Sequence, residues 1–232
     1  MRFLIFTIYA PLAAYGETVM GRRRTSWTRP GRAAVLGMVG AALGVENDDA
    51  RAHAALASSL GFAVRTDATG TAMMDYHTFS AGQGARAQRS RTRRQELSND
   101  VLTKVTYREY REDSLHTVAL WAHDVGEWSL DNIAQALRRP RWVLYVGRKS
   151  CPLALPANPE VIGAETLQKA LAQRPALPPA IAEHMQIKFD ARPSIASDSD
   201  APGAVPTQIE VRRDGYYARR TFRERTEYIM EA

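Results

Sequence analysis

The first apolar run of the chain is rich in aromatic and β-branched side chains, and a proline ends it early. Residues 3–9 read FLIFTIY, and Pro11 interrupts the run before a convincing signal-peptide core is complete. Aromatic and β-branched residues are enriched in strands. The pattern therefore predicts a buried central strand over residues 3–9.

Further along the chain, the apolar pattern alternates between helix and strand periodicity. Gly44 marks the end of one helix, and Ser129 is a suitable N-cap for another helix whose apolar residues share one face. The predicted elements after the first strand are helices over 32–43 and 48–60, strands over 62–65 and 115–121, a helix that starts at 130 and is stopped by Pro140, and a strand over 142–146.

This order of elements is the split βαβ arrangement of the ferredoxin-like (RRM-like) domain. The predicted fold class is therefore α+β, with an antiparallel sheet, helices on one face, and the other face free to meet RNA. Many unrelated proteins share this arrangement, so the fold alone defines no activity.

An insertion over about residues 72–110 separates the second and third strands. Its ends, 73–79 and 101–110, carry β-forming residues, whereas its middle is polar and contains glycines. The middle also carries the arginines Arg86, Arg89, Arg91, Arg93 and Arg94. Because clustered arginines repel one another unless a polyanion is near, we predict a projecting β-hairpin whose basic tip contacts RNA or a partner subunit. The alternative is a disordered surface loop.

A basic glycine turn directly follows the strand predicted over 142–146. Gly147 allows a sharp turn or a close approach of the backbone, while Arg148, Lys149 and Ser150 offer donors suited to phosphate oxygens. The turn is a candidate site for an anionic chain. The alternative is an ordinary solvated turn.

A second basic segment, RRRTSWTR at residues 22–29, lies between the first strand and the first helix. Its guanidinium groups suit phosphates, its hydroxyl groups suit sugar or phosphate oxygens, and the Trp27 indole offers a surface for a base. Alternatively, Trp27 caps the core and the arginines extend along the surface.

Composition narrows the function classes. The 232 residues are 45% hydrophobic, which is enough for a sizeable core, and the net charge of +6 favours a polyanionic partner. The single cysteine, Cys151, excludes an internal disulfide and a Cys-based metal cluster, and the five histidines show no pair at zinc-motif spacing. We therefore expect no metal, no cofactor, a cytoplasmic location and, with no segment long enough to span a bilayer, no membrane association.

The C-terminal part, residues 154–232, is predicted to extend a domain formed by residues 1–153. We expect a helix over 165–173, a strand over 185–190, a flexible linker over about 192–206, and a closing hairpin of 209–217 with 221–229 around Asp214 and Gly215. An exposed basic face is predicted there, formed by Arg212, Arg213, Arg219, Arg220, Arg223 and Arg225.

Several short segments in order along the chain carry a resemblance to a known family. They are MRFLI (1–5), PLAAYG (11–16), residues 30–45, DYHT (75–78), YREY (107–110), TVALW (117–121) and GRKSCPL (147–153). Together they resemble the CasD subunits of the type I-E CRISPR surveillance complex Cascade, within the RAMP superfamily. The resemblance extends to about residue 153.

The resemblance implies a non-catalytic RNA-binding subunit that grips the 5′ handle of a CRISPR RNA (crRNA) and caps the backbone filament. It implies that the hairpin acts as a thumb, and that the partners are crRNA, the backbone subunit CasC, the large subunit CasA and, through the assembled complex, target DNA. The RNA-binding residues carried over are Tyr15, Arg24, Ser26, Arg29, Arg32, Tyr76, His77, Arg108, Arg148, Lys149 and Ser150.

Two alternatives remain open from the sequence. A related branch in type I-C systems resembles a metal-independent endoribonuclease, for which Tyr76, His77 and Lys104 are the candidate trio here. His77 would move a proton and Lys104 would stabilise the phosphorane. The other alternative is a scaffold that binds neighbouring subunits through apolar faces and does not contact RNA.

Overall fold

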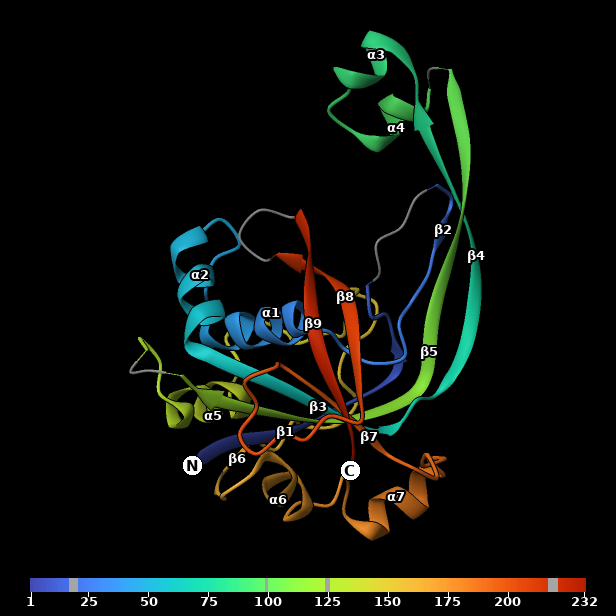
Figure 1. The fold of residues 1–232 in the computed structure, drawn as a ribbon. Coiled ribbons are helices and arrows are strands. Elements are labelled where there is room, and N and C mark those ends of the chain that lie inside the picture. Colours follow the sequence, from blue (N-terminus) through green and yellow to red (C-terminus); the bar gives the residue numbers. More distant parts are fainter. Residues whose placement is uncertain (17–20, 99, 124–125, 217–220) are drawn as a thin grey trace.

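The computed structural model describes residues 1–16, 21–98, 100–123, 126–216 and 221–232 (Figure 1). Its elements are β1 (Arg2–Ala13), β2 (Arg23–Arg24), α1 (Arg32–Leu43), α2 (Ala50–Ser59), β3 (Leu60–Ala68), β4 (Thr71–Gly82), α3 (Gly84–Gln88), α4 (Arg93–Leu97), β5 (Val101–Ala122), α5 (Leu130–Arg138), β6 (Glu160–Gly163), α6 (Leu167–Ala172), α7 (Pro179–Met185), β7 (Ser194–Ser197), β8 (Gln208–Tyr216) and β9 (Thr221–Glu231). No helix in this described part is long and apolar enough to cross a membrane.

The N-terminal strand and the helices α1, α2 and α5 form where the sequence predicts them, because their ends are set locally. Gly44 adopts a φ of 82° at the end of α1, and the Val45 N–H donates to the Gly40 carbonyl at 2.9 Å. The Ser129 hydroxyl accepts a hydrogen bond from the Asn132 N–H at 3.2 Å and starts α5.

One mixed sheet dominates the described structure. Its strand order is β6-β1-β5-β3-β7-β9-β8, and β2 and β4 pair with β5 off this path. The pairings are antiparallel except that of β2 with β5, which is parallel. The C-terminal extension thus continues the sheet begun by the N-terminal strands.

The strand predicted over residues 142–146 does not form. These residues are irregular apart from an isolated bridge between Tyr145 and Pro152, and β6 pairs with β1 instead. Pro140 and Pro152 flank the segment and lack the backbone donors that a ladder needs. Leu144 and Val146 still pack into the core, whereas Val143 is 78% exposed, so only part of this apolar run fills the core.

Both faces of the sheet are covered. On one face, Val35, Leu56 and Ile133 from α1, α2 and α5 pack on β1 and β5. On the other face, Leu167 and Leu171 of α6 pack on the sheet's Phe3, Ile5, Ala63, Ala119 and Trp121. The expectation of a sheet face free for RNA is therefore wrong, because the C-terminal extension folds back over it. For the same reason β3 is buried along its whole length and does not alternate between core and solvent.

The C-terminal extension differs from its prediction in several elements. Residues 185–190 form no strand, since α7 runs to Met185. The linker expected over 192–206 contains β7, a strand paired on both sides with β3 and β9. The predicted hairpin forms from β8 and β9. Asp214 and Gly215 lie in β8 and pair with Arg223 and Phe222 of β9, so they do not form its turn. The turn and Arg219 and Arg220 fall in 217–220, outside the described residues.

A buried arginine–carboxylate cluster, made of Arg29, Arg32, Arg212, Arg225, Asp198, Glu210 and Glu227, holds the C-terminal hairpin against the N-terminal half. At its centre, Glu227 is fully buried and accepts a hydrogen bond from Arg29 at 2.8 Å and another from Arg225. Arg212, expected to be exposed, is 1% exposed and donates to the Pro30 and Arg29 carbonyls. Buried charges require such pairing, since desolvating an isolated charge is very costly.

We expect the change Glu227→Ala to lower the free energy of unfolding by about 3–5 kcal/mol, because it removes the buried carboxylate that Arg29, Arg212 and Arg225 share. The matched control is Glu224→Ala on the same strand, since Glu224 and its partner Arg213 are both 63% exposed. The control should cost less than about 1 kcal/mol. Urea denaturation of both variants measures the difference, and equal costs would contradict the central role of Glu227.

Candidate nucleic-acid interface

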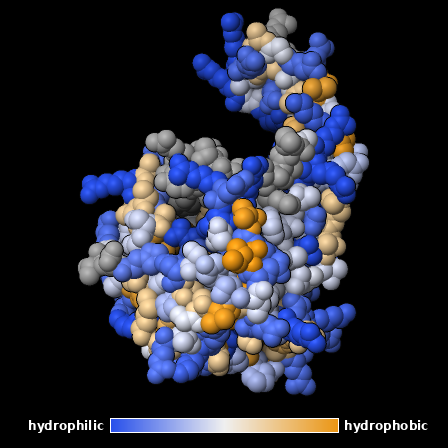
Figure 2. All heavy atoms as spheres, in the orientation of Figure 1, coloured by the Kyte–Doolittle hydropathy of each residue, from blue (hydrophilic) through white to orange (hydrophobic). Residues whose placement is uncertain are grey.

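Strands β4 and β5 form a long hairpin that rises away from the rest of the molecule (Figure 1). The tip carries the short helices α3 and α4 in place of a plain loop. Glu96 secures the tip, because its carboxylate pairs with Arg93 at 2.7 Å and accepts from the Gly82 N–H at 3.1 Å. Figure 2 shows mainly hydrophilic side chains over this tip.

The two faces of the hairpin differ in chemistry. Residues paired directly across strands share a face, so the register places His77 with Thr106, Phe79 with Lys104, and Asp75 with Arg108 on one side. Strand β2 adds Arg24 beside Arg108 on this side. We call this side the basic face, formed by Arg24, Lys104, Arg108, Arg148, His77, Phe79 and Tyr110; Asp75 is its acidic neighbour.

The opposite side of the hairpin carries aromatic residues. Tyr76 and Tyr107 are paired across β4 and β5, and their rings meet edge to face with centroids 5.6 Å apart. Tyr76 is 60% exposed and Tyr107 is 39% exposed. Tyr76 therefore lies on the side away from the basic face.

A hollow of about 460 Å³ lies between β2 and the hairpin. Arg22, Arg24 and Lys104 supply cations to its lining, and Phe79 and Leu102 supply apolar surface. Cations next to a ring suit the phosphates and the bases of a single strand.

The Gly147 turn lies at the base of this face and is held rigidly. Gly147 has a φ of 80°, and a β-carbon there would lie 1.7 Å from the Ala14 carbonyl oxygen. The Ala14 N–H donates to the Val146 carbonyl at 3.1 Å, and the Cys151 N–H donates to the Arg148 carbonyl at 2.8 Å. The backbone thus turns against the end of β1, at a separation that only glycine tolerates.

Arg148 connects the turn to the hairpin. Its guanidinium lies 4.4 Å from the centroid of the Tyr110 ring and donates to the Glu109 carbonyl at 3.1 Å. Lys149 and Ser150 are exposed beside it. The structure therefore brings Arg24, Arg108 and the Gly147 turn together, although they are far apart in sequence.

Four of the residues expected to bind RNA are engaged inside the protein. Tyr15 is 1% exposed, its hydroxyl is 2.8 Å from the Ser114 hydroxyl, and burial raises its pKa. Ser26 is buried and accepts from the Tyr15 N–H at 2.9 Å. Arg29 pairs with Glu210 and Glu227, and Arg32 pairs with Asp198 at 3.0 Å. The contacts of Tyr15, Ser26 and Arg29 support the loop that carries Arg24, whereas Arg32 joins α1 to Asp198 and to the carbonyls of Ala57 and Leu60.

Trp27 also has a supporting position. The Arg212 guanidinium lies 4.6 Å from the Trp27 ring centroid, and that of Arg29 lies 5.7 Å from it. The ring also packs against the core. Of the two interpretations of Trp27, the structure favours the one in which it caps the core.

The candidate nuclease trio does not assemble. His77 and Lys104 lie on the basic face, whereas Tyr76 lies on the opposite side with Tyr107. His77 has Asp75 as a neighbour, 4.0 Å away. The three side chains do not meet because Tyr76 and His77 are adjacent on β4, and adjacent residues of a strand point to opposite sides of it. Among the described residues, no group of three His, Cys, Asp or Glu side chains is placed to hold a metal ion.

The tip arginines remain candidate ligands for a polyanion. Arg89, Arg91 and Arg94 are exposed, whereas Arg93 is paired with Glu96. The side chain of Arg86 lies outside what the structure describes. Sequence reasoning did not include Phe79 or Tyr110 among the ligands, it offered Arg22 only as part of the basic segment 22–29, and it considered Lys104 only for catalysis. The strand register that groups these residues was the missing information.

Nearly the whole chain matches a known protein family. The family described as "CRISPR-associated protein (Cas_Cas5)" matches residues 3–227. The chain therefore belongs to the Cas5 family. One relative, the "CRISPR system Cascade subunit CasD" of Escherichia coli (strain K12), is 34% identical over 177 residues, which cover 73% of this chain and 75% of the relative. The resemblance to CasD seen in the sequence motifs is thus confirmed.

Two solved structures share the fold. A chain of a "CRISPR RNA-guided surveillance complex" superposes with a TM-score of 0.66 at 21% identity, over 99% of this chain and 90% of that chain. A "Crystal structure of Cas protein" superposes with a TM-score of 0.58 at 21% identity, over 99% of this chain and 93% of that chain. At this identity the likeness establishes a shared fold.

We expect Gly147→Ala to lower the stability of the protein by about 2 kcal/mol, because alanine is strained at positive φ and its methyl group would overlap the Ala14 carbonyl. The control is Gly163→Ala, where a β-carbon meets no atom within 4 Å. Thermal melting of both variants measures this. An unaltered melting temperature for Gly147→Ala would show that the turn is not held as described.

We expect the buried His116 side chain to make the protein less stable as the pH falls. Burial, together with nearby Arg29 and Arg212, lowers its pKa from 6.5 to about 3. Below pH 6.5 the His116 imidazole is protonated in the unfolded chain but stays neutral in the folded chain. The free energy of unfolding therefore decreases as the pH falls toward 3. Between pH 6.5 and 5 the loss is about 2 kcal/mol. Urea denaturation at both pH values should show a smaller loss for His116→Gln than for the native chain, and the same loss in both would contradict this prediction.

Proposed function

We propose that the chain is a non-catalytic, RNA-binding subunit of a Cascade-type CRISPR surveillance complex, and that its basic face holds the 5′ handle of the crRNA. The single observation that carries this proposal is the alignment of four cations on one side of the hairpin, with Arg24, Arg108 and Arg148 toward its base and Lys104 nearer its tip. Membership of the Cas5 family and the similarity to a CasD subunit support a place in a Cascade-type complex.

The proposed mechanism is binding, with no bond made or broken. Cations of the basic face neutralise phosphates, and Phe79 and His77 offer rings to bases that are unstacked. The buried cluster and the Gly147 turn hold these groups in place before RNA arrives, so little ordering cost is added on binding. Phosphate contacts position the strand, and contacts to base edges select its sequence.

The proposal includes the ferredoxin-like fold and the thumb. The order β6-β1-β5-β3 corresponds to the fourth, first, third and second strands of a ferredoxin-like sheet, once β6 takes the place expected of residues 142–146. The β4–β5 hairpin then acts as the thumb that folds over the guide toward the adjacent backbone subunit, CasC. In this arrangement the chain closes the filament, with the large subunit CasA close by and target DNA reached through the assembled complex.

A binding role is favoured over nuclease activity by the geometry of the hairpin. In the type I-C mechanism, the histidine, tyrosine and lysine must reach one scissile phosphate. Here Tyr76 lies on the opposite side from His77 and Lys104, so the three side chains cannot act on one phosphate without repacking the hairpin.

We expect the double change Arg148→Ala and Lys149→Ala to weaken binding of a synthetic 5′-handle RNA while the protein stays folded. If each cation neutralises one phosphate of a single strand, the slope of log K against log salt should become shallower by about 1.4, or ~0.7 per phosphate. Fluorescence anisotropy at several salt concentrations measures affinity and slope.

The matched control for this experiment is Arg51→Ala with Lys188→Ala, which removes the same charge from exposed positions in α2 and after α7. The control should keep the slope of the native protein. Native affinity in the folded Arg148/Lys149 variant would remove the turn from the RNA site. No RNA binding by the native chain, alone or in its complex, would instead favour the scaffold alternative.

A further inference from the structure

Strand β5 changes its partners and its surroundings at one residue, Asp113. Residues 101–112 form the hairpin with β4, whereas residues 114–121 are buried in the sheet between β1 and β3. Figure 1 shows β5 curving upward where it leaves the body of the molecule. Asp113 therefore lies where the hairpin joins the body.

The hydrogen-bonded ladders on both sides of β5 are interrupted at this point. On the β1 side, the register passes over Pro11, which has no N–H to donate to a ladder. On the other side, it passes over Thr69 and Gly70, between the end of β3 and the start of β4. The pairing of β3 with β5 also shifts register between Thr66 and Ala68. Because such irregularities let a strand bend, other contacts must fix its direction here.

The backbone of Asp113 is left-handed, with a φ of 53°. This conformation is uncommon for a residue with a side chain, and aspartate and asparagine tolerate it best. Gly70 on the neighbouring strand has a φ of 70°, and a β-carbon there would lie 2.2 Å from the Glu112 carbonyl oxygen. Strained backbone of this kind persists only where its surroundings hold it, and it commonly marks a functional position.

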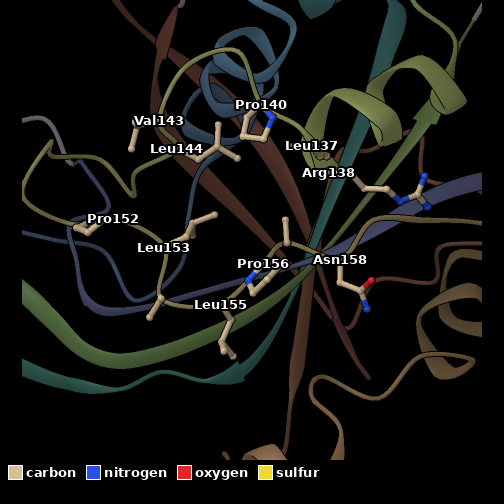
Figure 3. A pocket seen from close by; sticks show the side chains of 12 residues that line it. Leu137, Arg138, Pro140, Val143, Leu144, Pro152, Leu153, Leu155, Pro156 and Asn158 are labelled. Carbon is tan, nitrogen blue, oxygen red and sulfur yellow. The ribbon is translucent and has the colours of Figure 1, made fainter.

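The side chain of Asp113 is tied to the body by Tyr9. The Tyr9 hydroxyl donates to Oδ1 of Asp113 at 2.7 Å. Burial, together with the Asp113 carboxylate, raises the pKa of Tyr9 to about 12, so the hydroxyl keeps its proton. The Tyr9 ring is 4% exposed and packs with Leu115 and Leu177. Leu155, labelled in Figure 3, packs against the same cluster. The donor of this hydrogen bond is thus held in place.

The second strand of the hairpin is tied to the body at the same level. The N–H and the hydroxyl of Thr69 donate to Oδ2 of Asp190 at 3.0 and 2.6 Å. The Asp190 N–H in turn donates to the Asp67 carbonyl at 2.9 Å. We call Tyr9, Thr69, Gly70, Asp113 and Asp190 the hairpin joint. Both strands of the hairpin are therefore fixed where they leave the sheet.

We propose that Asp113 is a positioning residue, whose left-handed backbone and hydrogen bond from Tyr9 set the angle between the hairpin and the body. This angle decides where Lys104 and Arg108 stand relative to the guide. The effect on RNA rests on the proposed function, whereas the angle is a property of the chain alone.

The length of the hairpin makes this angle important. A strand rises ~3.3 Å per residue, so the twelve residues of β4 span ~40 Å, and a change of about 15° at the joint moves the tip by about 10 Å. Such a displacement separates the cations near the tip from those at the base, which then no longer face one RNA strand together.

The angle is measured on the full chain without RNA, as the distance between two spin labels by pulsed electron paramagnetic resonance. The labels are attached at Gln88→Cys in α3 and Ala54→Cys in α2, both exposed positions. The native Cys151 is 1% exposed and so is protected from labelling. Affinity for the synthetic 5′-handle RNA is measured separately on unlabelled protein by fluorescence anisotropy.

Asp113→Val introduces a β-branched residue that disfavours positive φ. We expect the mean label distance to shift by about 5–10 Å and the RNA affinity to fall about tenfold, because the ligands are no longer preorganised. Asp113→Asn keeps an acceptor for Tyr9 and tolerates the left-handed backbone, so it should keep the native distance and affinity. The matched control is Asn158→Val, since Asn158 is exposed at a φ of 44° away from the hairpin. It should carry similar strain and change neither the distance nor the affinity.

Two further variants remove the hydrogen bond from its two ends. Tyr9→Phe keeps the buried ring, and Asp113→Gly keeps the left-handed backbone without strain. Each should broaden the distribution of label distances, and the double variant should be no broader than Asp113→Gly alone, because both changes remove one interaction. These variants decide the question even if Asp113→Val does not fold.

A native distance in folded Asp113→Val would overturn the inference, as would native distributions in both Tyr9→Phe and Asp113→Gly. A shifted distance with native RNA affinity would also overturn it, by showing that the angle does not position the RNA ligands. If the native chain binds no handle RNA, alone or in its complex, the proposed function fails instead, and the label distances still decide whether Asp113 sets the angle.

Discussion

The burial of Glu227 is the constraint on which the rest of the structure depends. A fully buried carboxylate must be paired, and its partners come from the segment before α1 and from the C-terminal hairpin. This pairing joins the two ends of the chain across the sheet. Arg29 and Arg212 then hold Trp27 between them, and the Ser26 hydroxyl holds the end of β1. The strand that carries Arg24 is thereby positioned against β5.

The arginines of one short segment consequently have two roles. Arg29 is enclosed by carboxylates, whereas Arg24, a few residues earlier, lies exposed on β2 beside Arg108. The first arginine supports the architecture, and the second is available to a ligand. A basic segment is thus not a uniform ligand surface, because burial and pairing distribute its charges between structure and binding.

The long strand β5 and the segment after α5 contribute different residues to the basic face. Strand β5 begins at the hairpin tip and ends in the core, so the hairpin is continuous with the most buried part of the sheet. Because β5 continues into the central sheet, the strand that carries Lys104 and Arg108 is held in a fixed position. The segment after α5, which forms no strand, instead supplies the Gly147 turn and Arg148 at the base of the basic face.

The sequence by itself determined β1, α1, α2, α5, the paired ends of the hairpin and the β8–β9 pair, because caps, periodicity and β-forming runs act over a few residues. The basic glycine turn also made Arg148 a candidate RNA ligand, and the family motifs added Arg108. Only the tertiary structure decided that β6 replaces residues 142–146, that α6 covers the second sheet face, and that Tyr15, Ser26, Arg29 and Arg32 are enclosed. Arg29 and Arg32 are enclosed by partners more than a hundred residues away, Glu227 and Asp198, and the Tyr15 hydroxyl meets that of Ser114 on β5. Local patterns describe how a segment can fold, and burial by distant segments decides which of its side chains remain open to a ligand.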